Sequence, residues 1–312
     1  HLNFIRDVSW ASVLDRLLYG HTDAAHLLAP LAIATTLGRG RPAKALAVPF
    51  VLSLNGNAIT MSHALADKVA PAGMLGDPVS VGERLKSEVA KRAAAGCRIR
   101  FGVVHRYSGH NYKLRYWLAQ CGIAPDTDVD IVTIAPPFAA DALANAEVDG
   151  ICVGEPWNSV AVERDVGRIV LVTAQIWRRG VEKVLAMPAE KLDDDRDKIE
   201  NLVRALYFAA KHFVDPANWD ANAEILARKD YLDGSAKLIN RAISDRIMLT
   251  AGRSHSMCPI SCSSTGRRPI SRGKARRHGS IRNCCAGTIS PMMRRISCAQ
   301  SRFSDPMSIV RR

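Results

Sequence analysis

The chain contains 312 residues, of which 43 are Lys or Arg, 30 are Asp or Glu, and 47% are hydrophobic. This length suits one large or two medium-sized domains, and no run of residues approaches the roughly 18 apolar residues of a membrane span, which excludes a membrane-spanning helix. The sequence begins at His1 without an initiator Met, a basic segment or an apolar segment. No targeting peptide is readable, so we expect that a leader was removed or that the start is missing.

The net charge of +13 is unevenly distributed along the chain. Residues 251–312 contain twelve Arg, one Lys and one Asp, a net charge of +12, whereas residues 1–250 carry only +1. The same segment holds five of the eight Cys and twelve Ser, and it contains no Leu, Tyr, Trp or Glu. Such a segment buries too little apolar surface to offset the entropy of ordering, so we predict that residues 251–312 are disordered.

A frameshift would account for this unusual tail. When residues 279–291 or 258–266 are back-translated with suitable codons and read one base earlier, both become rich in Leu and aromatic residues. We therefore hypothesise that a frameshift near residue 251 replaced the native C-terminus, which the nucleotide sequence of the gene would decide. A basic arm that binds nucleic acid or acidic lipid is the less favoured alternative.

Residues 1–250 alternate short apolar runs with segments of helical periodicity. The predicted strands cover residues 2–8, 45–54, 100–104, 129–134, 148–153, 168–173 and 184–187. The predicted helices cover residues 10–18, 24–37, 81–95, 110–120 and 138–146, a segment from residue 156, and residues 197–214, 216–228 and 235–249. This alternation is typical of an α/β protein whose parallel sheets are covered by helices.

We predict two lobes, because residues 70–82 have the Gly and Pro content of a connection and the pattern of strands and helices then restarts near Cys97. In this division, residues 1–96 form the first part of lobe one, 97–176 form lobe two, 177–250 return to lobe one with C-terminal helices, and 251–312 form the tail.

Ligands of open α/β sheets bind beyond the carboxyl ends of strands, where loops meet helix N-termini. His110 lies in such a loop, beside Ser and Asn residues that are good N-caps, and the first-turn N–H groups there attract anions. Gly154 and Glu155 follow the predicted strand 148–153 in the same manner, and Gly allows close approach of the backbone to a ligand. Helix capping alone would also explain each segment.

Three further residues occupy comparable positions. Lys183 precedes an apolar strand and could project a cation into a cleft, although an ion pair with Glu182 is the simpler explanation. Trp10 begins a helix, where it is either a core residue or a platform for a ligand. Asn57 follows an Asn-Gly turn signal and could donate its amide to an oxyanion, although turn formation is sufficient reason for it.

Familiar catalytic and metal-binding motifs are missing from the sequence. It contains no G-x-G-x-x-G, Walker, H-E-x-x-H or G-x-S-x-G motif. Cys97, Cys121 and Cys152 lack ligand spacing, and the looser Cys258 and Cys262 lie in the tail. The segment Arg-Gly-Arg-Pro at residues 39–42 matches the short minor-groove hook of some DNA-binding proteins. Because it lies in a nearly neutral region, we interpret this match as chance. We expect no catalytic residue, no metal, no cofactor and no nucleic-acid partner.

Several segments, in order along residues 8–250, together resemble the nitrate- and bicarbonate-binding receptors of ABC transport systems and their cytoplasmic nitrate-sensing relatives. The matching segments are VSWASVLDRL (8–17), DAAHLLAPL (23–31), LNGNAIT (54–60), GHNYKLRYWLA (109–119), CGIAPDTDV (121–129), the Pro-Pro near 136, DGICVGEPWN (149–158) and VEKVL (181–185). The resemblance implies a type II solute-binding fold, in which two α/β lobes are hinged around a cleft.

The resemblance also implies a ligand site, whose matching residues are Trp10, Asn57, His110, Gly154 with Glu155, and Lys183. The sequence departs from the family at Asn57, where some receptors have Gln, and at residues 179–181, which replace a His-Pro pair. Family members also place about forty residues, including the opening strand of lobe one, before the position of His1. We therefore expect an incomplete lobe one and a chain that folds poorly or binds weakly.

A buried anion needs a cation and several donors to offset its lost hydration, and the residues named above supply them. Bicarbonate receptors tend to recruit Ca²⁺, for which the sequence shows no acidic cluster, so we expect nitrate or nitrite as the ligand of an ABC importer. Such a protein would be periplasmic or membrane-associated if a leader is missing. The alternatives are a cytoplasmic nitrate sensor that sequesters a regulatory protein and, more remotely, an enzyme like the thiamine pyrimidine synthases, whose Cys-rich motif is missing from residues 1–250.

Overall fold

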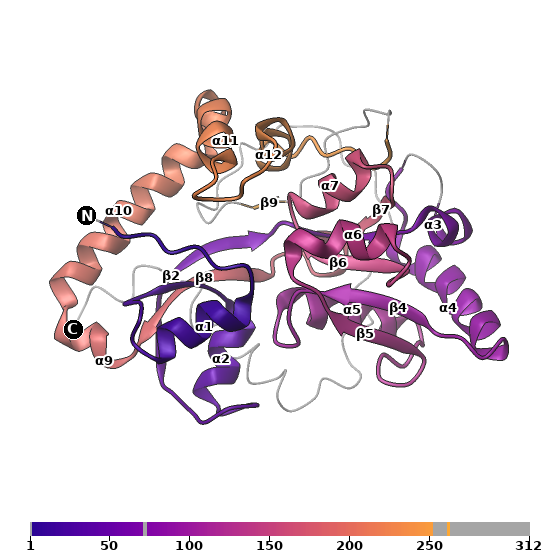
Figure 1. The fold of residues 1–312 in the computed structure, drawn as a ribbon, viewed down its shortest axis with the longest axis horizontal. Helices are drawn as coiled ribbons and strands as arrows, with labels where there is room; N and C mark the ends of the chain where they lie inside the picture. Colours follow the sequence, from indigo (N-terminus) through magenta and orange to yellow (C-terminus); the bar gives the residue numbers. More distant parts are fainter. Residues whose placement is uncertain (1, 71–73, 252–260, 263–312) are drawn as a thin grey trace, which may run out of the picture. The chain divides into compact units, whose positions relative to one another are not determined.

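The computed structural model describes residues 2–70, 74–251 and 261–262 (Figure 1). They belong to one unit, residues 1–266, whereas a second unit, residues 267–312, lies outside the described part of the chain. Nearly all of the predicted tail and its suspected frameshift therefore fall outside the described residues. Within the described part, no helix has both the length and the apolar character needed to cross a membrane.

The strands of the described residues form two sheets. The four-stranded sheet has the order β1-β8-β2-β9, and all its neighbours are antiparallel. Its strands are β1 (Ala25–Leu28), β2 (Leu46–Asn55), β8 (Val181–Pro188) and β9 (Ser261–Cys262).

The five-stranded sheet has the order β5-β4-β6-β3-β7. Strands β5, β4 and β6 are parallel, whereas β3 is antiparallel to both β6 and β7. Its strands are β3 (Asn57–Met61), β4 (Ile99–Val103), β5 (Val129–Thr133), β6 (Gly150–Gly154) and β7 (Arg168–Val172).

Helices surround both sheets. Helices α1, α2 and α10 contact the four-stranded sheet, and α5, α6 and α7 contact β6 of the five-stranded sheet (Figure 1). The helices are α1 (Trp10–Leu18), α2 (Ala29–Thr36), α3 (His63–Val69), α4 (Pro78–Ala94), α5 (Gly109–Gln120), α6 (Ala139–Ala144), α7 (Trp157–Glu163), α8 (Thr173–Ile176), α9 (Glu190–Asp194), α10 (Arg196–Val214), α11 (Trp219–Ala227) and α12 (Ala236–Ile243), with short 3₁₀ turns at Pro136–Phe138 and Pro216–Asn218.

Two large apolar clusters support the sheets. In the first, Phe101 of the five-stranded sheet belongs to one buried group with Leu65 of α3, Leu85 of α4 and Leu114 of α5. The second joins Leu14 of α1, Leu27 of β1 and Val184 of β8 to Leu143 of α6 and Ile151 of β6, so it continues from one sheet to the other. Burial of this apolar surface is the main stabilising contribution to such a fold.

The chain crosses between the sheets at Asn55 and Gly56, which end β2 and precede β3. Both residues have a positive φ, 55° for Asn55 and 79° for Gly56, the left-handed conformation that Asn and Gly tolerate best. The Asn55 backbone N–H donates to the Gly180 carbonyl over 2.8 Å, and the Asn55 side-chain oxygen accepts from the Gly180 N–H over 3.0 Å. These two hydrogen bonds hold the segment where the chain leaves the four-stranded sheet against the segment that leads back into it at β8.

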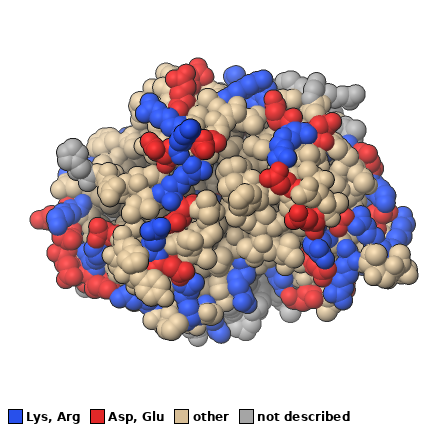
Figure 2. Space-filling model, viewed as in Figure 1, with Lys and Arg blue, Asp and Glu red and all other residues tan. Residues whose placement is uncertain are grey.

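Charged side chains of both signs are interspersed on the face of the molecule shown in Figure 2. Surface pairs such as Lys44 with Glu190 and Arg196 with Glu200 contribute to this pattern. The mixture agrees with the net charge of +1 over residues 1–250. Isolated exposed pairs of this kind add little to stability, because water and salt screen them.

Most predicted elements are confirmed, but two assignments near the N-terminus are wrong. Residues 2–8 form no strand, and Leu2 and Phe4 are exposed, because apolar content alone makes no strand without a neighbour that supplies hydrogen bonds. The single helix predicted over residues 24–37 is strand β1 followed by helix α2. Pro30 lies in the first turn of α2, where its missing N–H is harmless, whereas it would disrupt a helix interior.

The predicted sheet organisation also needs correction. Neither sheet is wholly parallel, since the four-stranded sheet is antiparallel and β3 runs against its neighbours. No strand was predicted at β3, where only the Asn-Gly turn signal before Asn57 was noted, yet all five residues of β3 are buried. Because β3 belongs to the five-stranded sheet, the chain leaves the first sheet at Gly56, well before the expected boundary at residue 97. A fully buried strand lacks the alternation that would reveal it in the sequence.

Candidate functional site

The candidate site lies where the chain passes between the two sheets. Asn57 is the first residue of β3 and pairs in register with Gly154, the last residue of β6. The Asn57 carbonyl accepts a hydrogen bond from the Thr173 hydroxyl over 3.1 Å. His110 is the second residue of α5, whose N-cap Ser108 accepts from the Asn111 N–H over 3.0 Å. Two strand ends and a helix start thus meet at one place.

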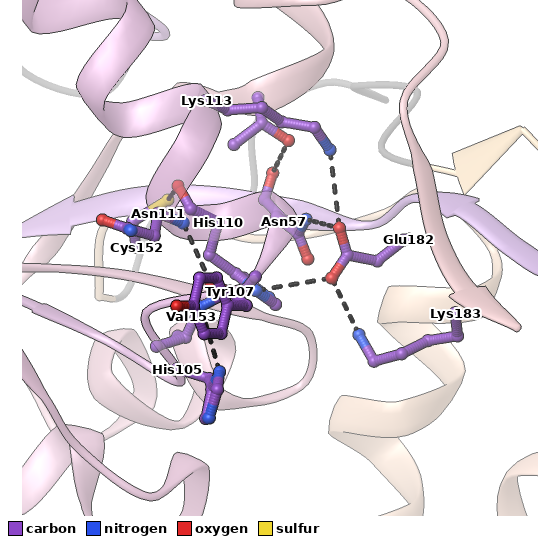
Figure 3. A network of polar contacts seen from close by, with 12 residues as sticks. Asn57, His105, Tyr107, His110, Asn111, Lys113, Cys152, Val153, Glu182 and Lys183 are labelled. Atoms are coloured by element: carbon purple, nitrogen blue, oxygen red, sulfur yellow. Dashed lines mark hydrogen bonds and ion pairs between the residues drawn. The ribbon is translucent and has the colours of Figure 1, made fainter. Parts of the chain in front are cut away.

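The centre of this place is the carboxylate of Glu182, which is 1% exposed (Figure 3). Its Oε2 accepts from Asn57 Nδ2 over 2.7 Å and lies 3.5 Å from Lys113 Nζ. Its Oε1 accepts from Lys183 Nζ over 2.9 Å and lies 3.3 Å from His110 Nδ1. One buried carboxylate therefore contacts an amide, an imidazole and two ammonium groups.

Two glycines leave room for this arrangement. A Cβ atom on Gly109 would collide with Oε2 of Glu182, so the carboxylate rests directly on the first turn of α5. A Cβ atom on Gly180 would lie 2.6 Å from Cε and 2.7 Å from Nζ of Lys113. Neither glycine has a positive φ, so their role here is the space that the missing side chain leaves.

The charges of the cluster follow from its contacts. Burial favours the neutral form of the Glu182 carboxyl, but the neighbouring His110, Lys183 and Lys113 outweigh it and hold the pKa of Glu182 below its usual range. Burial, aided by the two lysines, lowers the pKa of His110 from 6.5 to about 3 against the opposing effect of Glu182. At neutral pH, Glu182 is therefore ionised and His110 is neutral.

Trp10 reaches the cluster through Lys183. The Lys183 ammonium lies 5.1 Å from the centre of the Trp10 ring, within the range of a cation–π contact. His26 of β1 also contacts the indole of Trp10, with the two rings nearly perpendicular and their centroids 5.7 Å apart. Trp10 packs against the second apolar cluster, so it is at once a core residue and a neighbour of the site.

The absence of a side chain at Gly154 leaves a small space beside two polar atoms. A Cβ there would lie 3.4 Å from Asn57 Oδ1 and 3.6 Å from His110 Nε2, both ordinary contact distances. These two atoms are buried and have no hydrogen-bond partner among the described residues. Unsatisfied buried polar atoms are costly and rare, so a group of them marks a place where a polar ligand would be stabilised.

Glu155 is turned towards its own helix. Its backbone N–H donates to the Gly56 carbonyl over 2.9 Å, so this donor is already engaged. Its Oε2 accepts from the Ser159 hydroxyl over 2.6 Å, and its Oε1 is buried without a hydrogen-bond partner in the described chain. Burial raises the pKa of Glu155 from 4.5 to about 7, although hydrogen bonds from Ser159 and Asn158 oppose the shift. The peptide bond to Pro156 is cis.

Of the residues predicted from sequence, the structure thus groups Asn57, His110 and Lys183 directly and adds Trp10 and Gly154 as their neighbours. Contact of any of them with a ligand stays a prediction, and the engaged N–H of Glu155 makes it the weakest candidate. Lys113 and Glu182 were missed as site residues. Lys113 lies three residues after His110 on one helix face, a spacing that could have pointed to it.

The polar groups of the described residues are not arranged to bind a metal ion. Within residues 2–70, 74–251 and 261–262, no group of three or more His, Cys, Asp or Glu side chains is placed to hold one. Near Glu182 the other polar groups are an amide, an imidazole and two ammonium groups, and ammonium groups cannot coordinate a cation. The donor set of this cluster suits an anion better than a metal.

Comparison with known proteins places this geometry in context. The chain is 32% identical over 232 residues to the bicarbonate transport ATP-binding protein CmpC of Synechococcus elongatus, a match that covers 74% of this chain and 33% of that protein. It is 31% identical over 258 residues to the nitrate/nitrite binding protein NrtA of the same species, covering 80% of this chain and 56% of that one. The chain therefore spans about a third to a half of these relatives.

The crystal structure of the periplasmic nitrate-binding protein NrtA from Synechocystis PCC 6803 has a similar fold. It superposes with a TM-score of 0.73 at 23% identity, over 82% of this chain and 65% of that chain. This likeness confirms the type II solute-binding fold expected from the sequence. Residues 1–227 match the NMT1-like family. The chain therefore belongs to the NMT1-like family.

Proposed function

We propose that this protein binds a small inorganic anion, with nitrate or nitrite as the first candidate, and serves as the solute receptor of an ABC importer. The observation that carries the proposal is the meeting of Asn57, His110 and Lys183 from three separate segments around one buried polar centre. The relatives named for nitrate, nitrite or bicarbonate transport support it.

The chemistry of the cluster suits an anion. Lys183 is only 14% exposed in its side chain and supplies a charge that burial strengthens. The ring of Trp10 lies against the ammonium group, 5.1 Å from ring centre to Nζ, and adds a cation–π contact. The space beside Gly154 would let an oxygen atom approach His110 and Asn57. Charge-assisted hydrogen bonds are the usual means of offsetting the lost hydration of an anion.

Bicarbonate is a second candidate ligand, which one observation favours. Because Asn57 Nδ2 donates to Glu182, the oxygen of that amide faces the space beside Gly154. A neutral His110 that donates from Nδ1 towards Glu182 would present a second acceptor at Nε2. Bicarbonate has a hydroxyl to donate to either atom, whereas nitrate can only accept hydrogen bonds.

In the proposed role the protein acts outside the cytoplasmic membrane or attached to it, with the membrane components of the transporter as partners. A cytoplasmic sensor that sequesters a regulatory protein is the alternative. We propose binding rather than catalysis, because the relatives are named as transport and binding proteins.

Calorimetric titration of nitrate, nitrite and bicarbonate into the chain tests the proposal. We expect saturable binding of at least one of them with a stoichiometry of one. Lys183→Ala removes the ammonium group, and a loss of roughly 2 kcal/mol or more in binding free energy is typical when one partner of a buried charge-assisted contact is removed. Lys198→Ala on α10 is the matched control, because that side chain is 81% exposed.

Each outcome of this titration leads to a different conclusion about the site. Binding by the parent and by Lys198→Ala, with weak or no binding by Lys183→Ala, supports the site. Equal affinities of Lys183→Ala and the parent would place the ligand elsewhere. A parent chain that binds none of the three anions at millimolar concentration, while its circular dichroism shows a folded protein, would refute the proposal itself.

A further inference from the structure

Three charged side chains in the cluster, Lys113, Glu182 and Lys183, are withdrawn from water. Glu182 is 2% exposed in its side chain, Lys113 is 9% exposed and Lys183 is 14% exposed. The two ammonium groups lie 3.5 and 2.9 Å from opposite oxygens of the carboxylate. Two ammonium groups and one carboxylate leave a fixed charge of +1, because His110 is neutral near pH 7.

Lys113 is the member of this set that capping and core packing do not explain. Its Nζ is buried but makes no hydrogen bond among the described residues, and it lies beside Glu182 at the distance of an ion pair rather than of a hydrogen bond. An ammonium group has three N–H donors. The space left by Gly180 is what allows it to reach this position.

Burying a lysine is costly unless its charge is needed or balanced. Lys183 alone would already balance Glu182, and the pair would then be neutral. The second lysine brings in an extra buried charge, which only another negative charge in the same place would offset. His110 Nε2 and Asn57 Oδ1, also buried and without partners among the described residues, belong to two residues that contact the same carboxylate.

We propose that Lys113 and Glu182 set the charge of the binding site at +1 and thereby select singly charged anions against doubly charged ones. The inference rests on the proposed function and goes beyond it, since it names the charge class of the ligand and assigns it to two residues outside the predicted site. A site of charge +1 is neutralised by one monoanion, whereas a dianion would leave a net negative charge buried beside Glu182.

The proposal predicts that the preference for monoanions or dianions changes with the net charge of the site. Glu182→Gln leaves two ammonium groups and a charge of +2, which suits a dianion. Lys113→Gln leaves one ammonium group and one carboxylate, a neutral site that attracts no anion strongly. The double variant Lys113→Gln with Glu182→Gln keeps only Lys183 and returns the site to +1. If Lys113 and Glu182 formed only a structural ion pair, the preference between monoanions and dianions would stay the same in all three variants.

The experiment measures the affinities of the full chain and these three variants for nitrate, perchlorate and sulfate by calorimetry at pH 7. Perchlorate and sulfate share a tetrahedral shape and differ in charge, so their ratio isolates the effect of valence. We expect the sulfate-to-perchlorate affinity ratio to rise at least about tenfold in Glu182→Gln, a cautious figure for one added charge at contact distance. We expect Lys113→Gln to bind every anion at least about tenfold more weakly.

The double variant is the decisive measurement. We expect its sulfate-to-perchlorate ratio to return to within about threefold of the parent ratio. It leaves neither Lys113 nor Glu182 charged without its partner, so it provides the test even where a single variant does not fold, as circular dichroism would show. A double variant that prefers sulfate, or a Glu182→Gln variant with an unchanged ratio, overturns charge selection while nitrate binding by the parent leaves the proposed function standing. A parent that binds none of the anions overturns both.

Discussion

Glu155 gives the most direct test of the electrostatics of this fold. Its carboxyl group is buried against the first turn of α7, where Ser159 is its hydrogen-bond partner through both hydroxyl and N–H. Burial raises the pKa of Glu155 from 4.5 to about 7. The folded protein therefore holds the proton of this group more tightly than the unfolded chain does.

The sign and size of the effect follow from linkage. A carboxyl whose pKa is raised on folding contributes stability below its unfolded pKa of 4.5, and this contribution is lost as the pH rises towards and beyond 7. The difference between the two pKa values corresponds to about 3 kcal/mol at most. Glu155→Gln removes the titration, so the variant should be more stable than the parent above pH 7 by roughly 1–3 kcal/mol.

The assay is urea-induced unfolding, followed by circular dichroism at pH 4.5, 6 and 8, of the parent, Glu155→Gln and the control Glu224→Gln. Glu224 is exposed on α11, so its variant should follow the parent at every pH. We expect the difference between Glu155→Gln and the parent to grow steadily with pH. A constant difference across this range would show that Glu155 titrates as it does in the unfolded chain, and the burial argument would be wrong.

Three other predictions concern the site and the crossing. Gly154→Val should abolish anion binding with little change in unfolding midpoint, because its side chain fills the space beside His110; calorimetry that finds unchanged affinity would contradict this. His110, whose pKa is lowered to about 3, should stay neutral when nitrate binds between pH 8 and pH 6, so binding should take up no proton at this residue. Calorimetry in buffers of different ionisation enthalpy measures proton uptake, and an uptake that His110→Gln abolishes would contradict a site of charge +1. Gly56 and Gly96 both have a positive φ and open space around them, so Gly56→Ala and Gly96→Ala should each lower the free energy of unfolding by about 1 kcal/mol. Only Gly56→Ala should also weaken anion binding, because Asn57 follows it.

The elements that the sequence predicted well are those with a clear period and a clear stop. Helix α4 has an Asp N-cap and a Pro at its start, and its observed extent differs from the prediction by only a few residues at the N-terminal end. Strand β3 was not predicted, because its sequence lacks such a signal. Every residue of it is buried between two partner strands, so it shows no alternation, and its short apolar run after Asn55 and Gly56 is indistinguishable from the end of a turn.

The site was predictable in part because Asn57 and His110 follow predicted strands and Lys183 precedes one, which are local properties. Asn57, His110 and Lys183 were identified in this way or through the family resemblance. Glu182 and Lys113 depend on a non-local fact, the approach of β8 to the first turns of α5. Before that approach is known, Glu182 is only a neighbour of Lys183, and Lys113 is one basic residue on a helix surface. Their importance becomes visible only when both are found buried.

The hydrogen bond from Asn57 to Glu182 joins a strand of one sheet to a strand of the other. A few residues away, the two hydrogen bonds between Asn55 and Gly180 hold the end of β2 to the start of β8 within the four-stranded sheet. Any rotation that separates the two halves must therefore loosen the polar centre, and any occupant of that centre must resist the rotation to the same extent. In this molecule, the affinity for a ligand and the extent to which the two halves open would therefore be coupled through one equilibrium.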